Sequence, residues 1–473
     1  MNVEIYNPLN LPAEFVTGGA TLDDAVRYHA ALSDFYSAHK ELLEAHPTEF
    51  YTRNQLDLLS QYADEVRLIP CTQMHRLLTR PAGGPGALSA YFTEAQRLAM
   101  AREVKLVGVE AMTIGRDLRA FVADKKVHEV ERFVNICRHL NVEHFVDVGA
   151  GKQALSVALS ALGCQGVTAV DAVFNSLSAG LRKQEWLMRK QTAPAAQVRV
   201  LHATVGSKSS GAAMGDIATQ ADNHDHDSAR FQTVITELTQ RSVRFALVGL
   251  HTCGELSNAI LGAYASTSAS ACCVVGCCYQ HIQSYPMSKS VGQGTVVTRQ
   301  ALLAAACSTS AVFIDRQAQR QRTQRPPSQL RLARALLQEL AEKISFDGLP
   351  AKIPMKSSDS FAQYCMRALE SAERCDAAAR IYGVSSLDQL FEQRLQDAPL
   401  IVGWHFLREA LAACVEAMVT VDRAVYLLER GSDVAVLPVF DPALSPRNLL
   451  ILATKPPRQS VGCPPNPKLQ GSR

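Results

Sequence analysis

The sequence predicts an α/β protein in which a largely parallel sheet carries a helical N-terminal region and a helical insertion before the last helix and strand pair. Two observations support this prediction. Residues 144–163 read as an apolar strand, a glycine-rich turn and a helix, which is how a nucleotide-type cofactor fold begins. From residue 144 to residue 276, short apolar runs alternate with stretches of helical spacing, and such alternation builds a parallel sheet covered on both faces.

Length and composition indicate an ordinary globular protein. The 473 residues allow two or three domains, or one domain with large insertions. The net charge of +3 is too small to indicate nucleic-acid binding by itself. No apolar run reaches about 18 residues and the first ten residues do not form a secretory signal, so neither a membrane span nor secretion is expected. The thirteen cysteines include two vicinal pairs, which favours reduced thiols in the cytoplasm or the nucleus.

The N-terminal region, residues 1–110, is predicted to be helical. Apolar residues recur at helical spacing in 22–45 and again in 91–106, and the Pro/Gly-rich stretch 80–88 reads as a loop between them. A further helix near 125–140 leads into the first strand. We therefore place the start of the cofactor-binding core at residue 111.

This core is predicted to run from 111 to 284 as alternating strands and helices. The polar, small residues of 207–230 are expected to form a disordered insertion between the third and fourth strands. Strands are predicted at 144–149, 166–171, 198–205, 245–250 and 272–276, and helices at 152–162, 173–190 and 255–265.

The C-terminal part is predicted to interrupt and then complete the sheet. Residues 285–400 lose the strand pattern and read as a helical insertion. The core then resumes over 401–455, with a strongly apolar helix at 404–431 that ends at Gly431 and a strand pair around the segment FDPALSPR. The Pro-rich, basic tail 456–473 is expected to be disordered.

The glycine turn indicates the cofactor. Asp147 precedes Gly149 and Gly151 in the pattern D-x-G-x-G, and Asp171 ends the next strand. A dinucleotide fingerprint would start with glycine as G-x-G-x-x-G, whereas the leading acid is typical of class I methyltransferases with a Rossmann-like sheet. The turn and the helix start would approach S-adenosylmethionine (SAM), and Asp171 would bind its ribose hydroxyls. An ordinary strand–helix turn with Asp171 as a strand-end cap is the alternative.

Several segments together resemble the methyltransferase-like protein twenty-five family, over roughly residues 110–455. The resemblance implies a methyltransferase fold more firmly than it implies a substrate. The family continues its turn as D-x-G-x-G-K-G, but this chain has Gln153 at the last glycine, where the side chain could crowd the methionine part of SAM. The matching segments are KKVHEV (125–130), DVGAGK (147–152), VGLHTCGELS (248–257), VGCCY (275–279), YPMSKSV (285–291) and FDPALSPRNL (440–449).

Four more residues are predicted to act at the site. His251 and Glu255 follow the fourth strand, where ligands gather in open α/β sheets, and His251 is the candidate general base or else packs the turn. Tyr279, past the fifth strand, would stack on a flat target base unless it belongs to the core. Lys126 would meet the SAM carboxylate or a substrate phosphate unless it lies on a solvated helix face.

The cysteines near the strand ends raise the question of a metal. Cys253, Cys277 and Cys278 could converge with His251 as soft ligands. The adjacent pair lacks C-x-x-C spacing, however, and free cysteine is a common small buried residue. The sequence therefore predicts no metal site.

RNA is the favoured acceptor. The segments H-x-C-G and Cys-Cys are similar to those of the eukaryotic tRNA acceptor-stem 2′-O-ribose methyltransferases, and the run 316–334 holds six arginines and no acid, which suits phosphates unless the run is a solvated linker. The overall hypothesis is a SAM-dependent methyltransferase of RNA. A protein methyltransferase and a non-catalytic binding subunit of the same fold stay open, and a dinucleotide oxidoreductase is disfavoured.

Overall fold

A computed structural model gives the arrangement of most of the chain. Parts of several predicted segments lie outside the residues that the structure describes, among them most of the loop 80–88, the end of the helical stretch 91–106, residues 207–223 of the insertion, residues 316–326 of the arginine run and residues 457–473 of the tail. The described residues are 9–15, 20–78, 86–103, 113, 119, 122–189, 198–203, 205, 224–292, 294–307, 327–350, 353–356 and 358–456.

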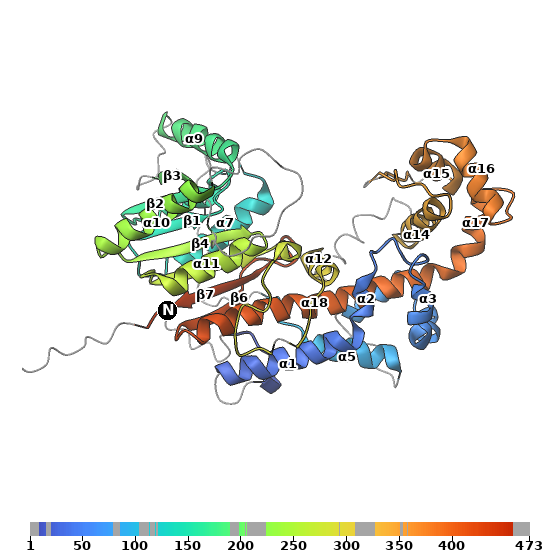
Figure 1. Cartoon of the computed structure of the whole chain (residues 1–473), viewed down its shortest axis with the longest axis horizontal. Helices are drawn as coiled ribbons and strands as arrows, with labels where there is room; N and C mark the ends of the chain where they lie inside the picture. Colours follow the sequence, from blue (N-terminus) through green and yellow to red (C-terminus); the bar gives the residue numbers. More distant parts are fainter. Residues whose placement is uncertain are drawn as a thin grey trace, which may run out of the picture.

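The described strands form one seven-stranded sheet in the order β3-β2-β1-β4-β5-β7-β6 (Figure 1). The first five strands in this order are parallel, and β7 pairs antiparallel with both β5 and β6. The predicted α/β fold of the class I methyltransferase type is thereby confirmed. The strands are β1 (His144–Val148), β2 (Gly166–Asp171), β3 (Val198–His202), β4 (Phe245–Thr252), β5 (Ala271–Gly276), β6 (Asp433–Pro438) and β7 (Leu449–Thr454).

Both faces of the sheet are buried, because successive side chains of a strand point to opposite sides. On β1, Phe145 packs in a core under α7 (Asp124–Cys137) and α8 (Ala154–Ser160), whereas Val146 packs in the core that holds α10 (His224–Gln240) and α11 (Glu255–Ser266). On β5, Cys273 packs in the same core as Phe145, and Cys272 packs in the same core as Val146. The strands therefore read as continuous apolar runs, as they do in parallel sheets.

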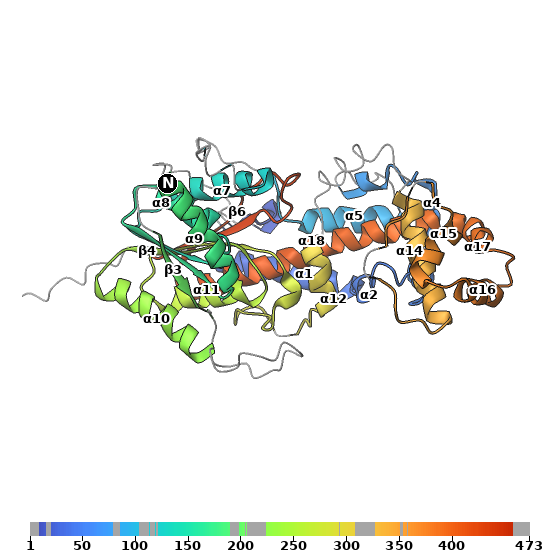
Figure 2. The same ribbon diagram turned by 90° about the horizontal axis from the view of Figure 1, so that it is seen from above.

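One long helix joins the sheet to the helical parts of the molecule. Helix α18 (Ala398–Leu428) runs from the side of β6 out to the far end of the molecule (Figures 1 and 2). It starts at Ala398 rather than at the predicted residue 404, because Pro399 in its first turn lacks only an amide hydrogen that a helix start does not need. Among the described residues, no helix has the combination of length and low polarity that crossing a membrane requires.

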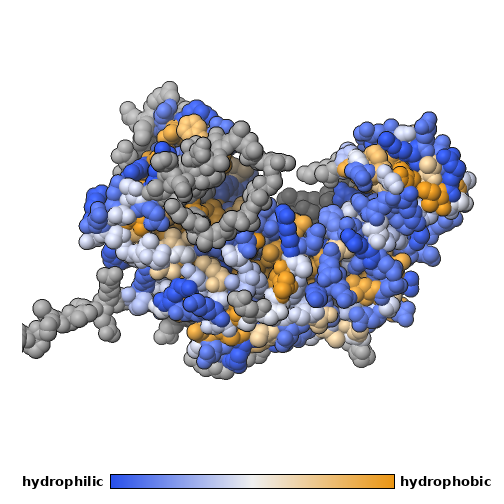
Figure 3. Space-filling view, in the orientation of Figure 1, coloured by the Kyte–Doolittle hydropathy of each residue, from blue (hydrophilic) through white to orange (hydrophobic). Residues whose placement is uncertain are grey.

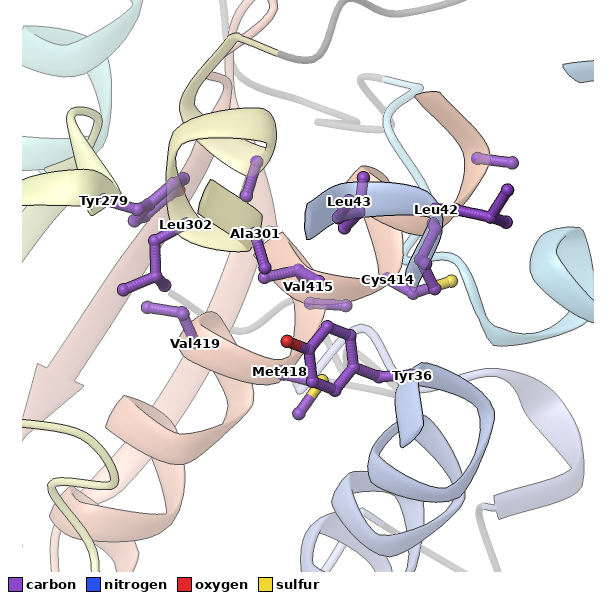
Figure 4. Close-up of a cluster of buried hydrophobic side chains, with 14 of the residues drawn as sticks. Tyr36, Leu42, Leu43, Tyr279, Ala301, Leu302, Cys414, Val415, Met418 and Val419 are labelled. Carbon is purple, nitrogen blue, oxygen red and sulfur yellow. The ribbon is translucent and has the colours of Figure 1, made fainter. Parts of the chain in front are cut away.

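The N-terminal helices and the insertion both pack on α18. Residues from α1, α2, α12 and α18 meet in one apolar cluster that includes Tyr36, Leu43, Leu302 and Met418 (Figure 4). The N-terminal helices are α1 (Leu22–His39), α2 (Glu41–Glu44), α3 (Gln55–Leu58), α4 (Ala63–Leu68) and α5 (Ala87–Leu98). The insertion holds α12 (Arg299–Cys307), α14 (Pro327–Lys343), α15 (Phe361–Leu369), α16 (Ala372–Ile381) and α17 (Leu387–Arg394).

One predicted boundary is wrong. The sequence interpretation extended a disordered insertion to residue 230, but α10 begins at His224. Apolar residues in the second half of this helix, Phe231, Val234 and Leu238, are buried against the sheet. Their burial stabilises a helix whose polar first turn shows no apolar periodicity, and this is why sequence pattern alone missed it.

Candidate active site

The glycine turn, Asp171 and His251 come together at the carboxyl edge of the parallel strands. The glycine turn follows β1, Asp171 ends β2, His251 lies near the end of β4, and Cys277 follows β5. Strand order reverses between β1 and β4, which are neighbours in the sheet although β2 and β3 lie between them in the sequence. In open α/β sheets the crevice at such a reversal is where ligands bind.

The glycine turn is open on one side. Gly149 and Gly151 have φ angles of +75° and +52°, which glycine adopts without strain. The amides of Gly149 and Ala150 donate to Val170 O at 2.8 and 3.0 Å, so the turn is folded back on β2. A Cβ added to Gly151 would meet nothing within 4 Å, whereas one at Gly149 would lie 3.1 Å from Leu256. The open space at Gly151 is a cradle that a bound cofactor could enter.

Asp171 ties the end of β2 to this turn. Its Oδ2 accepts from Gly151 N at 2.7 Å, and its Oδ1 accepts from Val173 N at 2.7 Å. A carboxylate has about four acceptor positions, so lone pairs remain for ribose hydroxyls. Because the Gly151 amide is already engaged and α8 is only seven residues long, the predicted binding of the SAM carboxylate by helix amides receives little support.

Asp147 is buried beneath the turn. Its side chain is 1% exposed, and Ser156 Oγ donates to Asp147 Oδ2 at 2.5 Å. Burial raises the pKa of Asp147 from 3.8 to about 6, although Ser156 and Lys126 oppose the shift. The carboxylate thus faces the first turn of α8 and anchors the glycine turn from below.

Replacing Asp147 with asparagine is expected to stabilise the protein above pH 6. In the folded state Asp147 keeps its proton up to about pH 6, whereas the unfolded chain releases it near 3.8, so ionisation costs stability above pH 6 and not below 3.8. Asparagine cannot ionise and still accepts from Ser156. We expect a gain of up to about 3 kcal/mol at pH 7.5. Urea unfolding at pH 7.5 and 4.5 measures it, and a gain that grows as the pH falls would contradict the assignment.

Lys126 lies between the turn and the cysteines. Its Nζ is 3.8 Å from Glu129 Oε2, and Asp147 and Cys277 both act on its charge. Burial lowers the pKa of Lys126, while these acids oppose the shift. The predicted position at the cofactor mouth is therefore compatible with the structure, and Lys126 offers an ammonium group to an incoming carboxylate or phosphate.

Gln153 does not crowd the turn, contrary to the sequence expectation. Its backbone has a φ of +61°, and its side chain is fully buried beneath helix α9 (Phe174–Arg189). Gln153 Nε2 donates to Leu177 O at 2.9 Å, and Gln153 Oε1 accepts from Gln184. The positive φ explains why glycine suits this position, since a residue with a Cβ is strained there. The hydrogen bonds to α9 offset that strain, and the side chain stays out of the cradle.

His251 is held by the buried carboxylate of Glu129, a residue on the helix before β1 to which the sequence interpretation assigned no role. His251 Nε2 lies 2.8 Å from Glu129 Oε1, and Ser445 Oγ donates to the same oxygen at 2.7 Å. Burial alone would raise the pKa of Glu129, but the hydrogen bond and charge of His251, with Ser445 and Lys126, lower it to about 2. Glu129 is therefore ionised at neutral pH and accepts from the N–H at Nε2 of His251. In a neutral imidazole whose proton is on Nε2, Nδ1 is the nitrogen that accepts a proton.

The loop between β6 and β7 completes this arrangement. The ring of Phe440 lies 6.4 Å from that of His251, and His128 Nε2 accepts from Asp441 N at 3.0 Å. The FDPALSPR segment therefore joins α7 and His251, although it lies far from both in the sequence. The sequence marked this segment as a distinctive motif, but it did not indicate that the segment lies beside His251.

Two predicted catalytic residues, Glu255 and Tyr279, have structural roles. Glu255 accepts from Gln283 N at 2.9 Å and from Ser284 Oγ at 2.8 Å, so it holds the loop after β5. Tyr279 is 3% exposed, its hydroxyl donates to buried Glu416 at 2.9 Å, and it packs in the apolar cluster beside Leu302 (Figure 4). Burial raises the pKa of Tyr279. Stacking of Tyr279 on a target base is thereby ruled out, because its ring is part of the core.

Three cysteines meet at the same edge of the sheet. Cys253 Sγ lies 3.2 Å from Cys277 Sγ and 3.3 Å from Cys278 Sγ, and the last two atoms are 3.6 Å apart. Hydrogen bonding with Cys277 and with Cys278, against the effect of burial, lowers the pKa of Cys253 to about 5. Lack of C-x-x-C spacing did not prevent convergence, because β5 ends at Gly276 and the next two residues are free of the strand's alternation.

Comparison with known proteins supports the fold-level interpretation. Residues 125–285 match the family described as "Methyltransferase domain". The human "Probable methyltransferase-like protein 25" is 27% identical over 232 residues, which are 44% of this chain and 36% of that protein. The mouse protein of the same name is 25% identical over 235 residues, which are 44% and 37% of the two chains. The chain thus covers little more than a third of the length of these relatives. The two similarities and the family match confirm the resemblance drawn from the motifs.

Proposed function

We propose that this chain, whose residues 125–285 match a methyltransferase domain, is a SAM-dependent methyltransferase acting on RNA. The single observation that carries the proposal is the shared edge of the sheet. There the open cradle at Gly151, which follows β1, adjoins Asp171 at the end of β2. The pair His251–Glu129 lies at the end of β4, the neighbour of β1 on its other side. A cofactor cradle next to a held imidazole is what methyl transfer to a weakly acidic group requires.

The residues present fit SAM. Gly149 and Gly151 would let the cofactor approach the backbone, and Asp171 would accept from its ribose hydroxyls. Lys126 would face its carboxylate. When bound, SAM supplies a methyl group on a positively charged sulfur. Gln153 packs under α9 and leaves this space open, which removes the main reason to favour a non-catalytic subunit.

The chain's own part in the reaction is to position the acceptor and take its proton. His251 would accept the proton of a nucleophilic oxygen or nitrogen at its free imidazole nitrogen. Glu129 would keep the ring in place and pair with the imidazolium that forms. His251 has a φ of +63°, a strained value for histidine, and such strain is often found where a side chain must be aimed at a ligand.

The positive charge on the helical arm formed by α14–α17 supports RNA as the methyl acceptor. The arginine run 316–334 reaches into α14, where Arg331 and Arg334 line a cavity of about 370 Å³ together with Arg408. Burial lowers the pKa of the two lining histidines, His46 and His405, so the positive charge of this lining comes from its arginines. Glu409 is the acidic residue of this lining. Figure 3 shows the surface hollowed between the sheet and the arm of α14–α17, whose outside is mostly hydrophilic. Cations placed away from the reaction centre would hold a long anionic substrate such as RNA.

Calorimetric titration tests the cofactor, and a labelled-methyl screen tests the acceptor. SAM should bind in the micromolar range, while NAD added separately should give no heat of binding. Labelled SAM incubated with cellular RNA and cellular protein should then transfer its methyl group to the RNA. Absence of SAM binding would leave a non-catalytic scaffold, and label found in protein alone would identify the rival acceptor class.

A further inference from the structure

We propose that Cys253, Cys277 and Cys278 form a zinc site at the carboxyl edges of β4 and β5. The proposal rests on the three sulfur atoms and their surroundings, and it holds whether or not the chain transfers methyl groups. Within the described residues, these are the Cys, His, Asp and Glu side chains whose ligand atoms are grouped closely enough to hold a metal ion.

The geometry of the sulfur atoms suits a single small ion. Their separations are 3.2, 3.3 and 3.6 Å. Zinc binds thiolate at about 2.3 Å, which in a tetrahedral site places the sulfur atoms about 3.8 Å apart. Each separation needs to grow by only a few tenths of an ångström, a movement within the reach of side-chain rotation.

The backbone around Cys253 is fixed in advance of any metal. The pairing of β4 with β5 is irregular between Leu250 and Thr252, directly before Cys253. Gly254 has a φ of +53°, and a Cβ there would collide with His281. Arg423, buried on α18, donates to Gly254 O at 3.3 Å and to Asn258 Oδ1 at 3.0 Å. A ligand-bearing turn held in this way loses little conformational freedom on binding an ion.

The surrounding charges also suit a thiolate–zinc group. Three thiolates around one Zn²⁺ carry a net charge of −1, and Lys126 and Arg423 both act electrostatically on Cys277. Each thiol would release its proton to solvent as it binds, so the affinity for zinc would decrease as the pH is lowered. His251 Nε2 is already bound to Glu129, so we do not expect it to be the fourth ligand. Because Cys253 is exposed to solvent, water can reach the ion and take the fourth position.

Metal analysis of the full-length protein tests the site. Purified without chelator and dialysed with zinc, the protein should retain one equivalent per chain. Replacing any of the three cysteines with serine should weaken zinc binding on the order of a hundredfold or more, since changes outside the ligand shell already cost ten- to a hundredfold. Cys164→Ser and Cys307→Ser, at a half-buried and an exposed cysteine away from the cluster, are the matched controls and should keep the ion.

A second measurement separates ligation from folding. Cobalt(II) in place of zinc should give intense thiolate-to-cobalt absorption in the wild type and in both controls, and this absorption should be lost in the three cluster variants while their circular dichroism stays native. No retained zinc in the wild type, or equal zinc in cluster and control variants, would overturn the proposal. So would a disulfide between two of the three cluster cysteines, located by peptide mapping of the wild type, because a bridged pair cannot hold the ion.

Discussion

Gly151→Leu is expected to abolish SAM binding and to leave the fold intact. A Cβ added at Gly151 meets nothing within 4 Å, so a leucine side chain there would extend into the proposed cradle and occupy it. The positive φ of +52° adds a strain of about 1–2 kcal/mol, which a protein of this size tolerates. Calorimetric titration with SAM measures the effect, and we expect no detectable binding at concentrations that saturate the wild type.

Gly163→Leu is the matched control for strain. Gly163 also has a positive φ, +76°, and a Cβ added to it would likewise meet nothing within 4 Å. It lies beyond the opposite end of α8, just before β2 starts, so it is remote from the cradle. Both variants should melt at similarly lowered temperatures, but only the variant at 151 should lose SAM. Equal SAM affinity in the two variants would remove the cradle from the proposed site.

His251→Asn is expected to slow methyl transfer by about 10²–10⁴-fold with SAM affinity near that of the wild type. Asparagine tolerates the positive φ of +63° better than most residues, so the turn should keep its shape while the proton acceptor is lost. Glu129→Gln should also slow transfer, because the neutral amide no longer pairs with the imidazolium. The rate of label transfer to RNA, at saturating SAM, is the measurement.

The double variant distinguishes a catalytic pair from two independent contributions. If Glu129 acts through His251, changing both residues should slow transfer no more than His251→Asn alone. Glu131→Gln, on the same helix and paired with Arg119 at the surface, is the control and should leave the rate unchanged. A loss of SAM affinity that matches the loss of rate would make His251 and Glu129 supports of the cofactor site and not the proton acceptor and its partner.

Motifs shared with the methyltransferase-like family turn out to serve packing as much as chemistry. In SPRN, Arg447 donates to buried Glu416 at 2.7 Å, and Asn448 donates to Phe440 O at 3.0 Å. In YPMSKS, Ser288 donates to Asp422 of α18 at 2.6 Å. The sequence could mark these segments as distinctive. It could not separate the residues that face the crevice from those that fasten the loops to α18.

The sequence by itself determined the parallel core and the position of the glycine turn. Continuous apolar runs specify strands buried on both faces, and the chain must turn at the glycines because only they adopt those φ values freely. Parallel strands bring their carboxyl ends together, so Asp147, Asp171 and His251 had to lie at one edge.

Only the tertiary structure decided which side chains meet at that edge. Glu129 reaches His251 because α7 packs beside the sheet, and Ser445 joins them because the β6–β7 loop folds over α7. Gln153 and Tyr279 turn inward because α9 and α18 offer buried partners. The three cysteine sulfurs converge through two loops on neighbouring strands. Local periodicity encodes which face a residue occupies, whereas such pairings depend on how separate elements dock, and no spacing within one element specifies that.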